Sequence, residues 1–141
     1  MVYQTRKAVV SLISNVAVYF ILFNKFGLLT NNDNQVWGQF FIVLLGLMIA
    51  TNIVVTIIFN IIHDIFSQHE APKKFDERDH TIELKAVRNF CFVLSFFFFA
   101  SMTTLAFQQP MSTMLLVMAT AVFAAMITLY TSYIFFYQRG Y

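Results

Sequence analysis

Four apolar runs take up most of this 141-residue chain and leave it few ways to fold. A helix of about 20 apolar residues crosses the hydrocarbon core of a membrane, and in lipid a helix satisfies its own backbone hydrogen bonds. We therefore expect an all-α polytopic membrane protein with four transmembrane helices in a single domain. The predicted helices cover about residues 8–29, 37–66, 77–107 and 111–136, and the third includes a charged extension outside the membrane.

The composition excludes several other classes of protein. Only 11% of the residues are charged and 59% are hydrophobic, whereas soluble domains carry about 25% charged residues. The net charge of +2 is too small to indicate a nucleic-acid partner. The single cysteine, Cys91, excludes an internal disulfide. The first apolar run is too long for the core of a signal peptide, so we expect it to be retained as a span.

The positions of the charges predict the orientation in the membrane. Ten of the sixteen charged residues lie between Ser67 and Arg88, ahead of the third apolar run. Eight of the nine Lys and Arg residues fall in the N-terminus, this stretch and the C-terminal tail. An even number of spans returns these three regions to one side, which the positive-inside rule makes cytoplasmic. We expect two antiparallel hairpins with both termini in the cytoplasm and the third helix extended into it.

Polar side chains recur at four-residue spacing in the first two spans, so each set shares one helix face. The residues are Ser11, Asn15, Tyr19, Asn52, Thr56 and Asn60. Matching depths in antiparallel helices pairs Asn15 with Thr56 and Tyr19 with Asn52. The pattern indicates either an interhelical hydrogen-bond zipper or a polar lining for ions or protons. The zipper is favoured, because no carboxylate or His lies at mid-depth.

The extension of the third helix segregates its charges. Asp76, Asp79, His80 and Glu83 fall on one face, and Arg78, Lys85 and Arg88 fall on the opposite one. Like charges at this spacing repel one another, so the acidic face gains from a cation laid against it. The basic surface of this chain or of a second copy, a divalent metal, and plain solvation are three alternatives. The candidate partner-binding residues are Asp76, Glu77, Arg78, Asp79, Glu83 and Lys85.

A metal site would draw on histidines and carboxylates near this extension. His63, Asp64 and His80 are the candidate ligands, and a nitrogen and oxygen donor set of this kind suits zinc, manganese or iron. Their spacing matches no established ligand motif such as H-E-x-x-H. We therefore expect no obligatory cofactor, with a divalent metal as the alternative.

The segment Asp76-Glu77-Arg78-Asp79, followed by Ile82 and Lys85, resembles a signature of a known family. The signature D-E-R-D-x-x-I-x-x-K precedes the third span in a family of small uncharacterised prokaryotic membrane proteins, classed as a domain of unknown function with four predicted spans. The resemblance implies a multi-pass protein of a bacterial or archaeal cytoplasmic membrane. It also implies a regulatory role, since some members look like partners of small helix-turn-helix regulators. His80 is not part of the signature.

Two functions of different classes follow from the sequence. The leading hypothesis is a non-enzymatic membrane protein whose charged cytoplasmic helix mediates self-association or binds a regulatory protein. The alternative is a small homo-oligomeric transporter of an ion or divalent metal. An enzyme is not expected, because no nucleophile and base pair and no phosphate-binding loop is recognisable. The expected partners are the lipid bilayer, further copies of the chain and a cytoplasmic regulator, with no nucleic acid.

Overall fold

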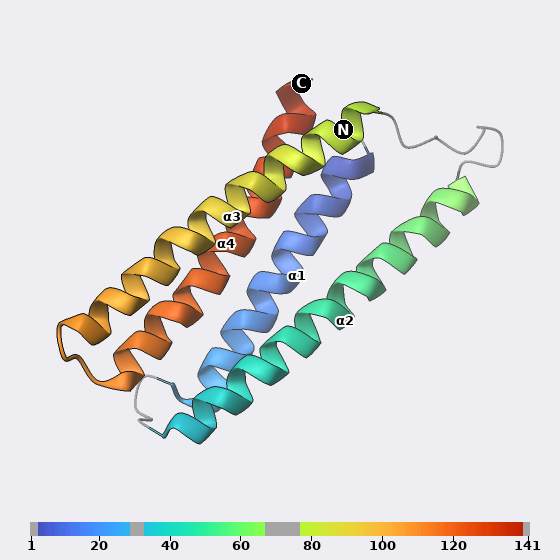
Figure 1. The fold of residues 1–141 in the computed structure, drawn as a ribbon. Helices are drawn as coiled ribbons and strands as arrows, with labels where there is room; N and C mark the ends of the chain where they lie inside the picture. Colours follow the sequence, from blue (N-terminus) through green and yellow to red (C-terminus); the bar gives the residue numbers. More distant parts are fainter. Residues whose placement is uncertain (1–2, 29–32, 67–76, 140–141) are drawn as a thin grey trace.

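The computed structural model describes residues 3–28, 33–66 and 77–139, and these form four long helices (Figure 1). The helices are α1 (Tyr3–Phe26), α2 (Asn34–Phe66), α3 (Glu77–Ala106) and α4 (Met111–Arg139). All four are long and apolar enough to cross a membrane. The predicted all-α class and the number of apolar helices are therefore confirmed.

The turn between α1 and α2 begins and ends three residues earlier than the sequence predicted. Gly27 has a φ of 56° and its N–H donates to the carbonyl of Asn24 over 3.2 Å, which ends α1 at Phe26. Glycine adopts this left-handed conformation without steric cost. Asp33 caps the start of α2, because its Oδ1 accepts the N–H of Gln35 at 2.9 Å.

α3 runs without a break from its charged first turns into its apolar part. It ends in a Schellman motif, in which Gln108 has a φ of 55° and its N–H donates to the carbonyl of Leu105 over 3.0 Å. The N–H of Gln109 donates to the carbonyl of Thr104, also over 3.0 Å. Pro110 then leads into α4. The expected helix cap, Asp76, lies outside the described residues.

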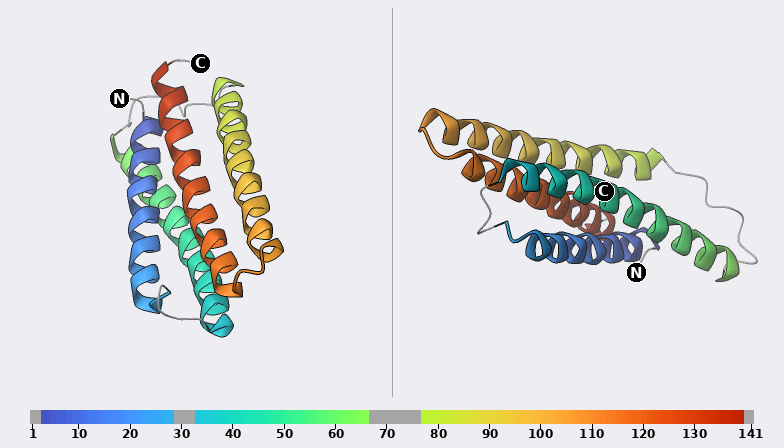
Figure 2. Two further views of the ribbon diagram at one scale, coloured as in Figure 1. Left: turned by 90° about the vertical axis from the view of Figure 1, so that its left-hand side faces the viewer. Right: turned by 90° about the horizontal axis from the view of Figure 1, so that it is seen from below.

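The four helices form an open array (Figures 1 and 2). α1 packs against both α2 and α4, α2 also touches α4, and α3 approaches α4 alone among the described helices. Both chain termini and the first turn of α3 lie at one end of the array, which we call the charged end (Figure 1). The α1–α2 and α3–α4 turns lie at the other end, the turn end.

Aromatic rings fill the space between α1, α2 and α4 toward the turn end. Tyr19 stacks on Phe123 with ring centroids 4.4 Å apart and meets Phe40 edge-on at 6.2 Å. Trp37 is buried beside Phe40. The buried members of this aromatic core are Tyr19, Leu22, Leu28, Trp37, Phe40, Leu44, Met48 and Ala119. The aromatic core fills the array between the polar residues of α1 and the turn end.

Small residues bring α3 against α4. Because α3 approaches only α4, its fully buried Ile82 and Ala86 must pack there. Asn89 donates to Ser132 Oγ at 3.1 Å and joins the two helices. Small residues allow close helix packing in lipid. Ser101 is a third fully buried residue of α3, and most of the remaining side chains of this helix are exposed.

Candidate functional site

A hydrogen-bonded cluster joins α1, α2 and α4 at the middle of their length. Asn15 Nδ2 lies 3.3 Å from Asn52 Oδ1 and 3.2 Å from the Tyr130 hydroxyl. The Tyr130 hydroxyl in turn donates to Asn52 Oδ1 over 2.7 Å. Three side chains from three helices therefore share one small network among apolar surroundings.

Each amide of this cluster is also held by its own helix. Asn15 Nδ2 donates to the carbonyl of Ser11 at 2.7 Å, and Asn52 Nδ2 donates to the carbonyl of Met48 at 2.9 Å. These bonds restrict the two side chains to one orientation. Asn15 Oδ1 is buried and has no hydrogen-bond donor among the described residues. Leaving such an acceptor unsatisfied costs about 1–3 kcal/mol.

The register of α1 against α2 differs by one turn from the predicted pairing. Asn15 meets Asn52 rather than Thr56, and Tyr19 lies in the aromatic core, stacked on Phe123. The prediction counted depth from the expected cytoplasmic boundaries of the two spans, at about residues 8 and 62. Residue 62 lies ten residues from Asn52, whereas residue 8 lies seven residues from Asn15, so these two boundaries do not lie at the same depth.

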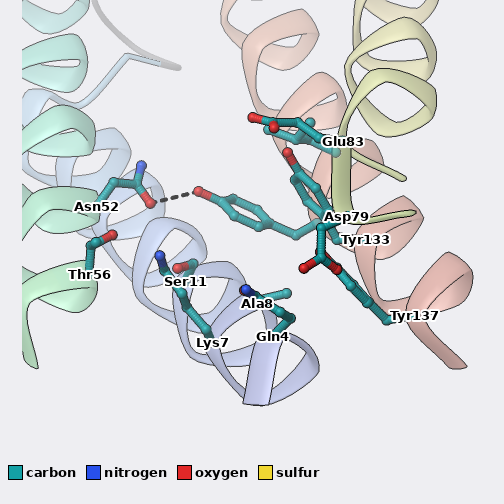
Figure 3. Close-up of a pocket in the computed structure, with 12 residues that line it drawn as sticks. Gln4, Lys7, Ala8, Ser11, Asn52, Thr56, Asp79, Glu83, Tyr133 and Tyr137 are labelled. Atoms are coloured by element: carbon teal, nitrogen blue, oxygen red, sulfur yellow. Dashed lines mark hydrogen bonds between the residues drawn. The ribbon is translucent and has the colours of Figure 1, made fainter. Parts of the chain in front are cut away.

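A cavity of about 290 Å³ with both polar and apolar lining extends from this cluster to the charged end. Its lining residues come from all four helices: Gln4, Lys7, Ala8, Ser11, Asn52, Thr56, Asp79, Glu83, Leu129, Tyr130, Tyr133 and Tyr137. In Figure 3, Asn52 and Thr56 of α2 lie on one side, and Asp79 and Glu83 of α3 lie on the other. The cavity joins the polar face of the first two spans to the acidic face of the charged extension.

The mouth of the cavity carries two carboxylates and one ammonium group. Asp79 lies beside Tyr137 in the lining, and Glu83 lies one helical turn further along α3 (Figure 3). Lys7 of α1 lies across the cavity from both (Figure 3). The charged groups of the lining therefore sum to one net negative charge, which favours a cation over an anion.

The remaining residues of the charged extension lie elsewhere. Glu77, Arg78 and His80 are exposed on the first turns of α3. Lys85 is half-buried, and its Nζ lies 5.8 Å from the centre of the Phe136 ring. The structure thus divides the six candidate partner-binding residues, because Asp79 and Glu83 line the cavity while Glu77 and Arg78 face outward.

The proposed metal ligands are not brought together in the part of the chain that the structure describes. The side chains of His63 and Asp64 lie outside the described residues, and His80 is exposed. No group of three His, Cys, Asp or Glu side chains suited to a metal occurs among the described residues. Asn60 is exposed on α2 and does not line the cavity.

Sequence reasoning missed the contribution of α4 to the site. Tyr130, Tyr133 and Tyr137 are not among the predicted site residues, yet all three line the cavity. Their spacing of three and four residues places them on one face of α4. This spacing on α4, compared with the polar faces of the first two spans, is the sequence signal that could have identified the three tyrosines.

Comparisons with protein-family models, with curated proteins and with solved structures found no match. The resemblance of the segment beginning at Asp76 to a four-span family therefore stays an expectation. The function is argued below from the cavity and its lining.

Proposed function

We propose that this chain is a non-enzymatic cation transporter of a prokaryotic cytoplasmic membrane, working as a homo-oligomer. Its four helices would cross the bilayer as two antiparallel hairpins, with the charged end in the cytoplasm. One observation carries the proposal. A cavity with an acidic mouth runs from the charged end to a hydrogen-bonded cluster inside the helix array.

The lining chemistry supports a cation as the solute. Asp79 and Glu83 outnumber Lys7, and the deeper wall presents the amide of Asn52 and the hydroxyl of Thr56. Oxygen atoms of this kind replace part of the hydration shell of a cation. Polar groups inside a membrane are costly and mark the pathways of solutes and ions.

The closed floor of the cavity supports transport by alternating access. Beyond Asn15 and Tyr130, the stacked rings of Tyr19 and Phe123 fill the space toward the turn end. A site that is open to one side and sealed on the other corresponds to one of the two states of such a cycle. Because α3 packs on α4 alone among the described helices, it can tilt without breaking contacts to α1 or α2.

A flux measurement tests the proposal. The purified chain is reconstituted in liposomes, and uptake of potassium, magnesium, manganese, protons and tetraethylammonium is measured under an imposed gradient. We expect flux of at least one cation, reduced at least tenfold in Glu83→Gln and Asn52→Leu. Glu77→Gln is the matched control, since Glu77 is exposed outside the cavity. Liposomes that pass none of these cations would reject transport.

The exposed charges of α3 favour a second candidate, the binding of a regulatory protein or a further copy of the chain. Glu77, Arg78 and His80 face outward on the first turns of α3. Reversal of Glu77 and Arg78, to Lys and Glu, should abolish crosslinking between copies or to a captured regulator. Reversal of Asp79 and Glu83 should then act on flux and leave crosslinking intact. Unchanged crosslinking after the outward reversal would remove this candidate.

A further inference from the structure

We propose that the solute of this cavity is a monovalent organic cation, an alkyl or quaternary ammonium compound carrying about one or two ring-sized apolar groups. The inference rests on the proposed binding of a cation and adds the chemical class. It follows from three properties of the lining: an aromatic wall, a single net negative charge, and a volume too large for a bare ion.

The aromatic wall is formed by one face of α4. Tyr130, Tyr133 and Tyr137 all line the cavity, and the rings of Tyr133 and Tyr137 are stacked with centroids 6.5 Å apart. Aromatic faces attract ammonium groups, and quaternary ammonium ligands are recognised by such rings. This observation is independent of the acidic residues.

The charges lie beside these rings. Asp79 and Glu83 are four residues apart, so they lie on the same face of α3, and they line the cavity together with Tyr133 and Tyr137 (Figure 3). Lys7 offsets one of the two carboxylates. A monovalent cation therefore neutralises the lining, whereas a divalent ion would leave it with excess positive charge.

The size of the cavity excludes a bare ion as the group that fills it. Its volume is about 290 Å³, and an apolar cavity of about 150 Å³ already holds benzene. Metal ions need several ligands converging at about 2.0–2.6 Å. Among the described residues no group of three metal-binding side chains converges. Leu129 and Ala8 add apolar surface that suits the hydrocarbon part of an organic cation.

Polar groups at the deepest point of the cavity distinguish between classes of ammonium ion. The Tyr130 hydroxyl donates to Asn52 Oδ1 over 2.7 Å, and Asn52 and Thr56 both line the cavity. The Thr56 hydroxyl can accept a hydrogen bond from the N–H group of a primary or secondary ammonium, whereas Asn52 Oδ1 already accepts from Asn15 and Tyr130. A quaternary ammonium lacks such donors and would rest against the tyrosine rings instead.

Calorimetric titration of the detergent-purified full chain with benzyltrimethylammonium tests the inference. We expect saturable binding that weakens at least tenfold in Glu83→Gln and about tenfold in Tyr133→Leu, while Tyr133→Phe binds nearly as well as the parent because its aromatic face remains. Lys7→Gln should strengthen binding several-fold by removing a competing positive charge. Glu77→Gln, outside the cavity, is the control.

The possible failures can be told apart. If magnesium, manganese or potassium binds and benzyltrimethylammonium does not, the organic class is wrong and the proposed cation site stands. If no cation binds, the proposed function fails with the inference. Weaker binding in Lys7→Gln, or equal losses in Tyr133→Phe and Tyr133→Leu at unchanged monodispersity and helix content, would also overturn the assignment.

Discussion

Replacing Tyr130 by Phe removes one hydroxyl and keeps the ring that fills the space between α1, α2 and α4. The hydroxyl takes part in two hydrogen bonds, with Asn15 and with Asn52. Such bonds contribute about 0.6 kcal/mol each in membrane proteins, with a maximum near 1.7 kcal/mol. Asn15 Nδ2 keeps the Ser11 carbonyl and Asn52 Oδ1 as acceptors, so the change orphans no donor. We therefore expect Tyr130→Phe to lower the free energy of unfolding by about 1 kcal/mol.

The matched control is Tyr19→Phe. Tyr19 is also buried and also packs its ring against neighbours on other helices, but it belongs to the aromatic core and not to the hydrogen-bonded cluster. Removing its hydroxyl should change the free energy of unfolding by less than about 0.5 kcal/mol. Both variants are measured by reversible unfolding in mixed detergent and lipid micelles, followed by circular dichroism.

A double-mutant cycle measures the hydrogen bond between the Tyr130 hydroxyl and the Asn52 amide separately from the other effects of each substitution. Tyr130→Phe and Asn52→Ala, made separately and together, should show a coupling energy of about 0.6–1.7 kcal/mol. Additive effects would mean that the hydroxyl and the amide do not interact in the membrane. An equal loss in Tyr19→Phe would mean that the cost comes from the ring environment. Either result refutes the claim that this cluster ties three helices together.

Three further predictions concern the turns and the orientation. Gln108→Gly should raise the free energy of unfolding by about 0.5–1 kcal/mol in the same assay, because Gln108 has a φ of 55° that glycine adopts more readily. Asp33→Ala should lower it by about 1 kcal/mol through loss of the cap on α2. On a Cys91→Ser background, an impermeant maleimide should reach cysteine at Lys74 from the cytoplasm and at Asn32 from the opposite side. Reaction of both from one side would reject the proposed orientation.

The number and type of helices were predictable because each apolar run carries its own signal. Length and hydropathy are local properties, and a backbone in lipid must close its hydrogen bonds within the segment. The helix ends were less predictable. Asp33 is a favoured cap, and Gly27 is a favoured C-terminal residue, yet both lie inside segments that composition alone assigned to a loop and a span. If the capping residues are considered before hydropathy, they predict both the end of α1 and the start of α2 correctly.

The candidate site was predictable only in part. The four-residue spacing identified Asn15, Asn52 and Thr56, and the structure places all three at the cluster or along the cavity. Their partners depended on the register between the helices, which the membrane boundaries expected from hydropathy did not fix to within one helical turn. Tyr130 comes from a helix 115 residues further along the chain than Asn15. No periodicity within one segment contains that information.

The rotation of α3 decides what its segregated charges do. A helix that packs on one neighbour has a single seam, which Ile82 and Ala86 form here against α4. At about 100° per residue, Asp79 and Glu83 flank that seam on one side and Lys85 flanks it on the other. The seam therefore turns the carboxylates toward the cavity and keeps the ammonium group of Lys85 away from it, over Phe136. The charge pattern alone fitted an external partner equally well. The two apolar positions within it place half-buried Asp79 and exposed Glu83 at the mouth of the cavity.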